Sequence, residues 1–163
     1  MKKLYKISLI VYLLFLLWLV LFKFSSDPFS VLANYQSRSL NLMPFAGYSP
    51  GIAREMIDNF IVFIPFGLLL GMNFKHIVFW QKLTYICMFS AGAEIAQFVF
   101  AIGTTDVTDV ITNTLGGLFG LTAYRLGSRY IEHKKLGLYI VITLAILVIT
   151  FTLLRFLVFK VRY

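Results

Sequence analysis

Five long apolar runs, separated by short polar segments, constrain the fold of this chain more than any other feature. The first run, ISLIVYLLFLLWLVLF at residues 7–22, lies between Lys6 and Lys23, whose side chains can reach the membrane interface. With those flanks its length approaches the roughly 20 residues that a helix needs to cross a bilayer. No small-residue cleavage site follows, so we interpret it as an uncleaved anchor. The other runs predict helices at residues 58–74, 83–102, 107–124 and 136–158.

The composition agrees with a surface that faces lipid. Apolar residues make up 60% of the chain and charged residues only 13%, whereas soluble domains use about a quarter charged residues. The net charge of +8 comes from basic residues scattered between the apolar runs, without a continuous patch, so we exclude nucleic acid as a partner. We expect an all-α polytopic membrane protein with about five transmembrane helices, and the lipid bilayer as its partner. Its oligomeric state is open.

The distribution of basic residues predicts the orientation, because cytoplasmic segments of membrane proteins carry an excess of Lys and Arg. With the N-terminus cytoplasmic, the inner segments hold nine basic residues: Lys2, Lys3, Lys6, Lys75, Lys82, Arg125, Arg129, Lys134 and Lys135. The outer segments then hold six: Lys23, Arg38, Arg54, Arg155, Lys160 and Arg162. We therefore expect a multi-pass protein of the bacterial cell membrane with a cytoplasmic N-terminus.

Two linking segments predict how the helices are arranged. The short GTTD link at residues 103–106 predicts a tight antiparallel hairpin between the third and fourth helices. In the fourth helix, Gly116 and Gly120 form a small-xxx-small pair that permits close helix approach. The loop at residues 23–57 contains three of the four prolines, which end helices at this density. Whether this loop closes over the bundle is open.

Acidic and amide side chains gather near one end of the expected bundle, on the outside in this orientation. Helical spacing places Ser90, Glu94, Gln97 and Ala101 on one face of the third helix, and Asp106, Asp109, Asn113, Gly116 and Gly120 on one face of the fourth. The hairpin lets these faces meet, and Asp58 and Asn59 are expected to open the second helix at the same depth. Ionisable groups at membrane depth are costly and usually functional. The predicted binding site contains Arg54, Asp58, Asn59, Glu94, Gln97, Asp106, Asp109 and Asn113.

Several of these residues also have a purely structural interpretation. Asp58 and Asp106 can cap helix N-termini, Asn113 can form a bond between helices, and Gln97 can serve only to satisfy Glu94. Arg54 can anchor the interface or pair with Asp58. We favour function for Glu94, because a Gln would serve packing there without an ionisable group.

The chemistry of familiar catalytic and metal sites is missing from the sequence. No His or Cys pair has the spacing of zinc ligands, and no nucleophile-elbow, HExxH or phosphate-loop motif is present. We therefore expect no metal and no cofactor, and we assign no catalytic residue.

Four stretches, RSLNLMPF, REMIDNFIVFIPFGLLL, AEIAQFVFAIG and TDVTDVITNTLGGLFGL, together resemble the VanZ-like family. The resemblance covers nearly the whole chain and implies a single VanZ-like transmembrane domain at residues 1–163. It implies a role in low-level resistance to teicoplanin-type glycopeptides at the cell membrane of a Gram-positive bacterium. Many family members carry an Arg before the Asp-x-x-Asp motif, where this chain has GTTD, so a basic partner for the acids is absent there or is supplied by Arg54.

Three functional hypotheses remain. In the first, the outward acidic and amide site reduces access or binding of the glycopeptide at the outer surface, by engaging a lipid-linked cell-wall precursor, a lipid head group or the drug. In the second, the protein is an intramembrane enzyme that modifies a lipid or wall precursor, with Glu94 as acid or base. In the third it is a proton-coupled transporter, which the absence of internal repeats disfavours. Of these, we favour the hypotheses in which the protein is not an enzyme.

Overall fold

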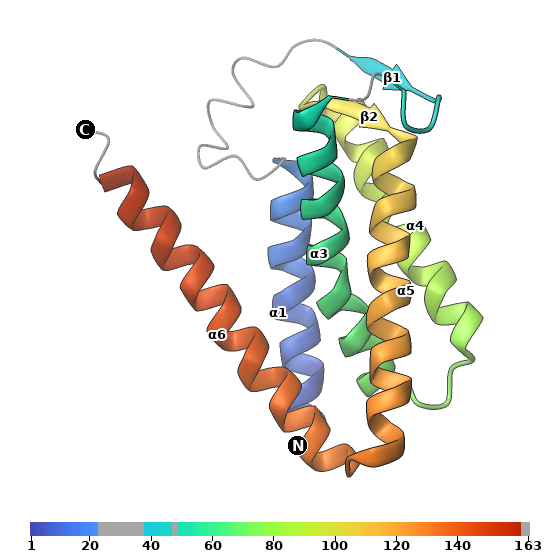
Figure 1. Ribbon diagram of the computed structural model, residues 1–163, viewed down its shortest axis with the longest axis vertical. Helices are drawn as coiled ribbons and strands as arrows, with labels where there is room; N and C mark the ends of the chain where they lie inside the picture. The colour runs from blue at the N-terminus through green and yellow to red at the C-terminus, as the bar shows by residue number, and fades with distance from the viewer. Residues whose placement is uncertain (23–37, 47–48, 161–163) are drawn as a thin grey trace.

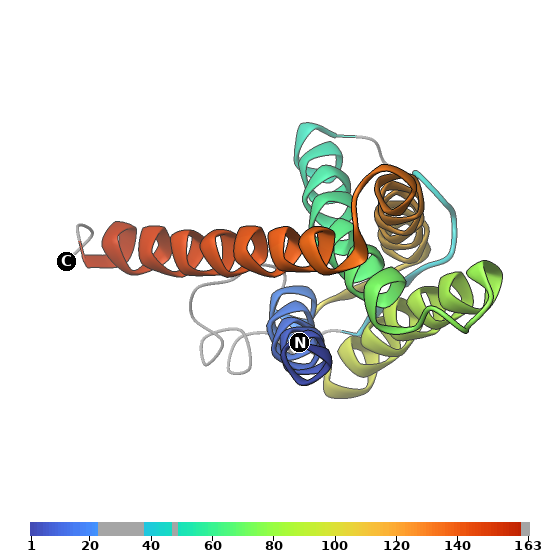
Figure 2. The same cartoon turned by 90° about the horizontal axis from the view of Figure 1, so that it is seen from below.

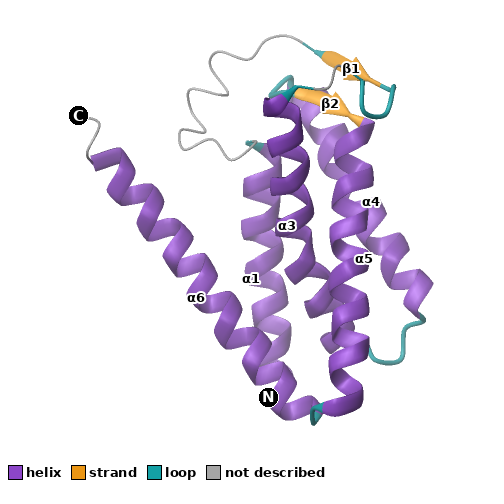
Figure 3. Cartoon of the chain, viewed as in Figure 1, coloured by secondary structure: helices purple, strands orange, loops and turns teal. Residues whose placement is uncertain are grey.

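The computed structural model describes residues 1–22, 38–46 and 49–160, the side chains of 155–160 excepted. Its elements in chain order are α1 (Lys2–Leu21), β1 (Ser39–Asn41), α3 (Pro50–Asn73), α4 (Phe79–Phe100), β2 (Thr104–Asp106), α5 (Val107–Tyr130) and α6 (His133–Lys160). Helices α1, α3, α4 and α5 form a bundle, and the two short strands lie together across one of its ends (Figures 1 and 3). We call this end the strand end, and the one where the chain begins the N-terminal end.

Four helices in the described ranges are long and apolar enough to cross a membrane: α1, α3, α4 and α6 as far as Leu154. The fold is all-α in its body, as predicted, and it is compatible with a polytopic membrane protein. Helix α5 is less apolar because its interior face is polar. Thr108, Asp109, Thr112 and Asn113 are all buried there, against the neighbouring helices.

Helix α3 begins at Pro50, not near residue 58 as the sequence had indicated. Proline at the first position of a helix loses no hydrogen bond, because the first N–H groups lack partners in any case. Ser49 caps the helix by accepting a hydrogen bond from the Ile52 N–H at 3.3 Å. Asp58 and Asn59 therefore lie inside the helix and do not open it.

Helices α3 and α5 run side by side in the same direction, away from the strand end (Figure 1). Glycines allow their backbones to approach closely. A Cβ atom built on Gly116 would collide with the backbone oxygen of Phe60, and one on Gly120 would collide with that of Ile64. The expectation of close packing at this glycine pair is confirmed, and the partner helix is α3.

The hydrophobic core fills the space between these helices and α1. Phe63, Phe66 and Phe89 pack with ring centroids 5.2 to 6.3 Å apart. Leu16 and Leu69 are fully buried beside them. Burial of large aromatic side chains supplies much of the packing energy of such a core. It holds α1, α3 and α4 together and so sets the position of the strand end.

The two strands form a parallel pair that the sequence did not predict. Ser39, Leu40 and Asn41 lie opposite Thr104, Thr105 and Asp106. Each strand has three residues, too few to show an alternating pattern, and α3 and α4 separate them in the chain. Part of the 23–57 loop thus packs on the strand end. The open question of closure by the rest of the loop concerns residues 23–37 and 47–48, which lie outside the described residues.

Helix α6 contacts the bundle near its start and then leans away from it (Figures 1 and 2). The Tyr5 hydroxyl donates to the Lys134 backbone oxygen at 3.2 Å, and Ile140 and Leu144 are buried. Farther along, Leu147, Ile149 and Leu153 are exposed, which suits contact with lipid.

Candidate functional site at the strand end

A pocket of about 220 Å³ opens at the strand end, between β1, β2, α3 and α5. Three carboxylate side chains line it, from Glu55, Asp106 and Asp109, together with polar groups from Asn41 and Thr104. Because the lining residues come from three separate segments of the chain, 39–41, 52–56 and 104–109, the pocket depends on the whole strand end being assembled. We call it the acidic pocket.

Asp106 is the N-cap of α5 and also a wall of the acidic pocket. Its Oδ1 accepts a hydrogen bond from the Thr108 N–H at 2.7 Å, which satisfies one of the unpaired donors at the helix start. Its Oδ2 accepts from Asn41 Nδ2 at 2.9 Å. The capping interpretation of Asp106 is therefore confirmed, and the same carboxylate ties β1 to β2.

Asp109 is buried one turn farther along α5. Its Oδ1 accepts a hydrogen bond from Asn59 Nδ2 on α3 at 2.8 Å. Asp109 is 6% exposed and Asn59 is 5% exposed, so this contact is shielded from water. A hydrogen bond to a buried carboxylate is among the stronger ones in proteins, and it fixes α3 against α5 beneath the pocket.

Glu94 supports the pocket from behind and is not among the described residues that line it. Its Oε2 accepts from the Asp106 N–H at 2.9 Å, and its backbone oxygen accepts from the Thr105 hydroxyl at 3.1 Å. At 3% exposure Glu94 points into the protein, not toward lipid. The structure thus brings Glu94, Asp106 and Asp109 into one region, with Glu94 bonded to the backbone.

Gln97 and Asn113 are fully buried and connect helices. Gln97 Nε2 donates to the Val20 backbone oxygen at 3.0 Å, in the last turn of α1, where carbonyls lack the usual partner four residues on. Asn113 Nδ2 donates to Ser90 Oγ at 2.8 Å. Gln97 therefore bonds to α1, whereas the sequence had suggested Glu94 as the group it satisfies.

Arg54 and Asp58 lie apart from the acidic pocket. The Arg54 Nε and Asp58 Oδ2 atoms are 3.9 Å apart, and the side chains are 85% and 41% exposed, respectively. Exposed pairs of this spacing contribute only about 0.3–0.5 kcal/mol. In the described ranges Arg54 makes no bond to Asp106 or Asp109, so this structure does not show it as their basic partner.

Glu55 and Thr108 line the acidic pocket, and the predicted binding site did not contain them. Glu55 lies four residues before Asn59 and so shares its helix face, but a helix start near residue 58 placed Glu55 in a loop. Thr108 Oγ1 accepts from the Phe45 N–H at 3.0 Å, a contact that depends on the fold of the 38–46 segment.

The arrangement favours a ligand with hydrogen-bond donors or a positive charge. Carboxylates offer only acceptors when ionised, and three of them face one small volume. No group of three or more His, Cys, Asp or Glu in the described part of the chain has the geometry of a metal site. A cationic amine or a set of N–H and O–H donors is the chemistry that this pocket would recognise.

Comparison with known proteins agrees with the resemblance noted in the sequence. Residues 9–128 match the VanZ/LLP1 family. Over 128 residues the chain is 55% identical to Protein VanZ from Enterococcus faecium, and the match covers 78% of each chain. No solved structure matches. By the extent of both matches, the chain belongs to the VanZ/LLP1 family.

Proposed function

We propose that this protein confers low-level resistance to teicoplanin-type glycopeptide antibiotics, as a multi-pass protein of the bacterial cell membrane. Two observations support the proposal: membership of the VanZ/LLP1 family, and the four apolar helices that suit a membrane. The acidic pocket is the site that we assign to this role, and its carboxylate lining is the single observation that carries the assignment.

The proposed orientation places the strand end outside the cell. Lys75, Lys82 and Arg125 gather at the N-terminal end, around one pocket, and such an excess of positive charge is typical of the cytoplasmic side. With that end inside, Asp106 and Asp109 face the outer surface, where glycopeptides act on cell-wall precursors. The acidic pocket would then be accessible to both drug and precursor.

The size of the acidic pocket limits what it can hold. Sites for whole drug-sized molecules usually measure about 300–1,000 Å³, and this pocket measures about 220 Å³. A glycopeptide is far too large to enter. We infer that the pocket receives one donor-bearing group, such as an amine, of a lipid-linked wall precursor, a lipid head group or the drug. Binding of that group in the pocket would reduce drug access or binding at the outer surface.

The alternative is an intramembrane enzyme with Glu94 as acid or base. That role requires the Glu94 carboxylate to reach a substrate. The hydrogen bond from the Asp106 N–H occupies its Oε2, and Glu94 does not appear among the described residues of the pocket wall. The geometry favours Glu94 as a positioning residue for Asp106.

The experiment is a resistance assay in a glycopeptide-susceptible Gram-positive host that expresses the protein. We expect Glu55→Gln and Asp109→Asn each to lower teicoplanin resistance toward that of the empty host, and cell-bound labelled teicoplanin to rise. Glu132→Gln removes an exposed carboxylate at the opposite end and should keep full resistance. Membrane protein levels are measured for each variant. Full resistance in both pocket variants at normal levels would refute the site.

A further inference from the structure

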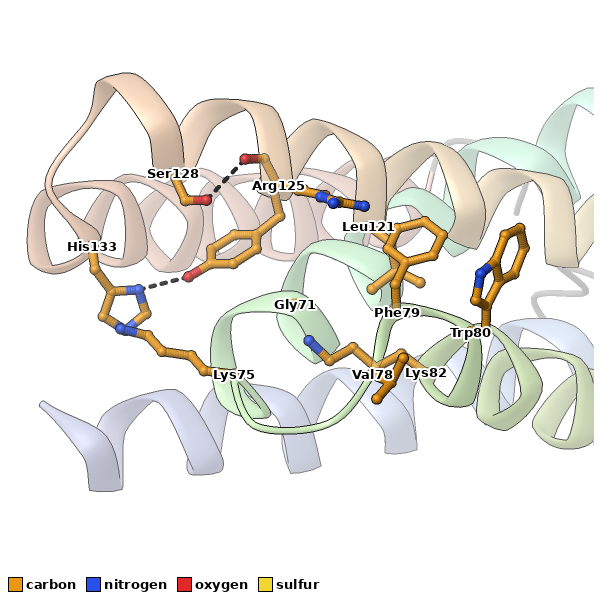
Figure 4. Close-up of a pocket in the computed structure, with 11 residues that line it drawn as sticks. Gly71, Lys75, Val78, Phe79, Trp80, Lys82, Leu121, Arg125, Ser128 and His133 are labelled. Carbon is orange, nitrogen blue, oxygen red and sulfur yellow. Dashed lines mark hydrogen bonds between the residues drawn. The ribbon is translucent and has the colours of Figure 1, made fainter.

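A second pocket, of about 660 Å³, lies at the N-terminal end, far from the acidic pocket. The end of α3, the start of α4, the last turns of α5 and the start of α6 surround it (Figure 4). Its cationic and imidazole side chains come from Lys75, Lys82, Arg125 and His133. No carboxylate is among the described residues that line it. We call it the basic pocket.

Lys82 is the residue that most needs a ligand. The whole residue is 8% exposed, and no ion pair joins it to any described residue. Figure 4 shows its ammonium group pointing into the pocket below Gly71. An ammonium held between protein walls without a counterion loses part of its hydration, and an anion that accepts its hydrogen bonds offsets that loss. The fold therefore presents a charge without its counterion.

The other basic groups surround the same volume. The Arg125 guanidinium carbon lies 5.8 Å from the centroid of the Phe79 ring, a contact that holds the side chain over the pocket. The Tyr124 hydroxyl and His133 Nδ1 are 2.6 Å apart. When Tyr124 donates this bond, the neutral imidazole carries its proton on Nε2, which gives the pocket one more N–H donor.

The remaining lining is apolar and aromatic, from Val78, Phe79, Trp80 and Leu121. A site with several cationic donors beside apolar walls fits a molecule with an anionic head and an apolar body. Basic pockets between helices on the cytoplasmic side are the places where anionic lipid head groups bind. Trp80, which is 67% exposed, is typical of the membrane interface.

We propose that the basic pocket binds a phosphate group, supplied by the head group of an anionic phospholipid of the cytoplasmic leaflet. Lys82 and Arg125 neutralise the phosphate, and the Nε2 proton of His133 is a further donor. The apolar wall receives the first carbons of the lipid. This site is separate from the one proposed for resistance, because it lies at the other end of the bundle.

The test measures the affinity of the purified full-length protein, in neutral detergent, for short-chain phosphatidylglycerol and for phosphatidylcholine by titration calorimetry. We expect phosphatidylglycerol to bind about tenfold tighter or more, because phosphatidylcholine adds to the same phosphate a quaternary ammonium that the basic pocket repels. Lys82→Met and Arg125→Gln should each weaken phosphatidylglycerol binding about tenfold. Lys82→Arg should largely retain it, which keeps the test valid if Lys82→Met folds poorly.

Lys135→Met is the matched control. It removes an exposed positive charge at the same end that is not in the pocket wall, and binding should change by no more than about twofold. Competition with inorganic phosphate identifies the source of the phosphate. If it does not displace phosphatidylglycerol, the site is a lipid site. If inorganic phosphate displaces phosphatidylglycerol and binds with a similar affinity, the site takes soluble phosphate. Equal affinity for both lipids, or equal weakening by Lys82→Met and Lys135→Met, would overturn the proposal.

Discussion

Asn59 and Asp109 meet inside the bundle, where the amide Nδ2 of one donates to the carboxylate Oδ1 of the other at 2.8 Å. The contact joins α3 to α5 at the floor of the acidic pocket, and both side chains are almost completely buried. It couples the stability of the helix pair to the position of a carboxylate that the proposed function uses.

Removing the amide should therefore destabilise the protein. Asn59→Leu leaves the Asp109 carboxylate buried with one donor fewer, at a cost of about 1.5–3 kcal/mol. Thermal unfolding in detergent measures the effect. The double variant Asn59→Leu with Asp109→Leu should cost less than the sum of the two single variants, because the lost donor then leaves no charge behind. Strictly additive costs would show that the two residues do not interact.

The close approach of α3 and α5 makes Gly116 intolerant of a side chain. Gly116→Ala places a Cβ against the Phe60 backbone oxygen, and such overpacking costs about 1–3 kcal/mol. Gly92→Ala is the matched control, because no atom lies within 4 Å of its added Cβ. That variant should gain about 0.5–1 kcal/mol. Equal melting temperatures for the two variants would contradict the packing described.

Ala101 caps the C-terminal end of helix α4, and its φ of 53° and ψ of 38° are left-handed. This conformation strains every residue that carries a Cβ, by about 1–2 kcal/mol. Ala101→Gly removes the strain but adds freedom to the unfolded chain, which offsets about 0.4–1 kcal/mol. We expect a net stabilisation of about 0.5–1 kcal/mol. Ala93→Gly, within the same helix, should instead destabilise the protein. A lower melting temperature for both variants would contradict the strain at Ala101.

The helical body of the fold was predictable from the sequence, because long apolar runs and the GTTD link act locally. The start of α3 was not predictable, since a proline breaks a helix at interior positions and is tolerated only in the first turn. Pro50 occupies that first turn, directly after the Ser49 cap. Glu55 was left out of the predicted binding site for that reason. The β1–β2 pair and the bond from Gln97 to α1 depend on contacts between distant segments. Helical spacing cannot reveal those contacts, whereas it did place Glu94 near Asp106.

Two substitutions of Glu94 separate a positioning role from acid–base catalysis. Glu94→Gln keeps a side-chain oxygen that can accept from the Asp106 N–H, so we expect most of the resistance to remain. Glu94→Ala leaves that N–H without its acceptor, at a cost of about 1–3 kcal/mol, and should lower both resistance and melting temperature. Loss of all resistance in Glu94→Gln, with unchanged stability, would support the enzyme instead.

The account depends most on the acidic pocket facing the outside of the cell, and cysteine labelling tests this directly. After Cys87 is replaced by Ser, Thr104→Cys places one thiol at the exposed pocket rim and Ser128→Cys places one at the opposite end. In intact cells a membrane-impermeant maleimide should label position 104 and leave position 128 unlabelled until the membrane is opened. Labelling of position 128 alone in intact cells would put the carboxylates in the cytoplasm and contradict the proposed function.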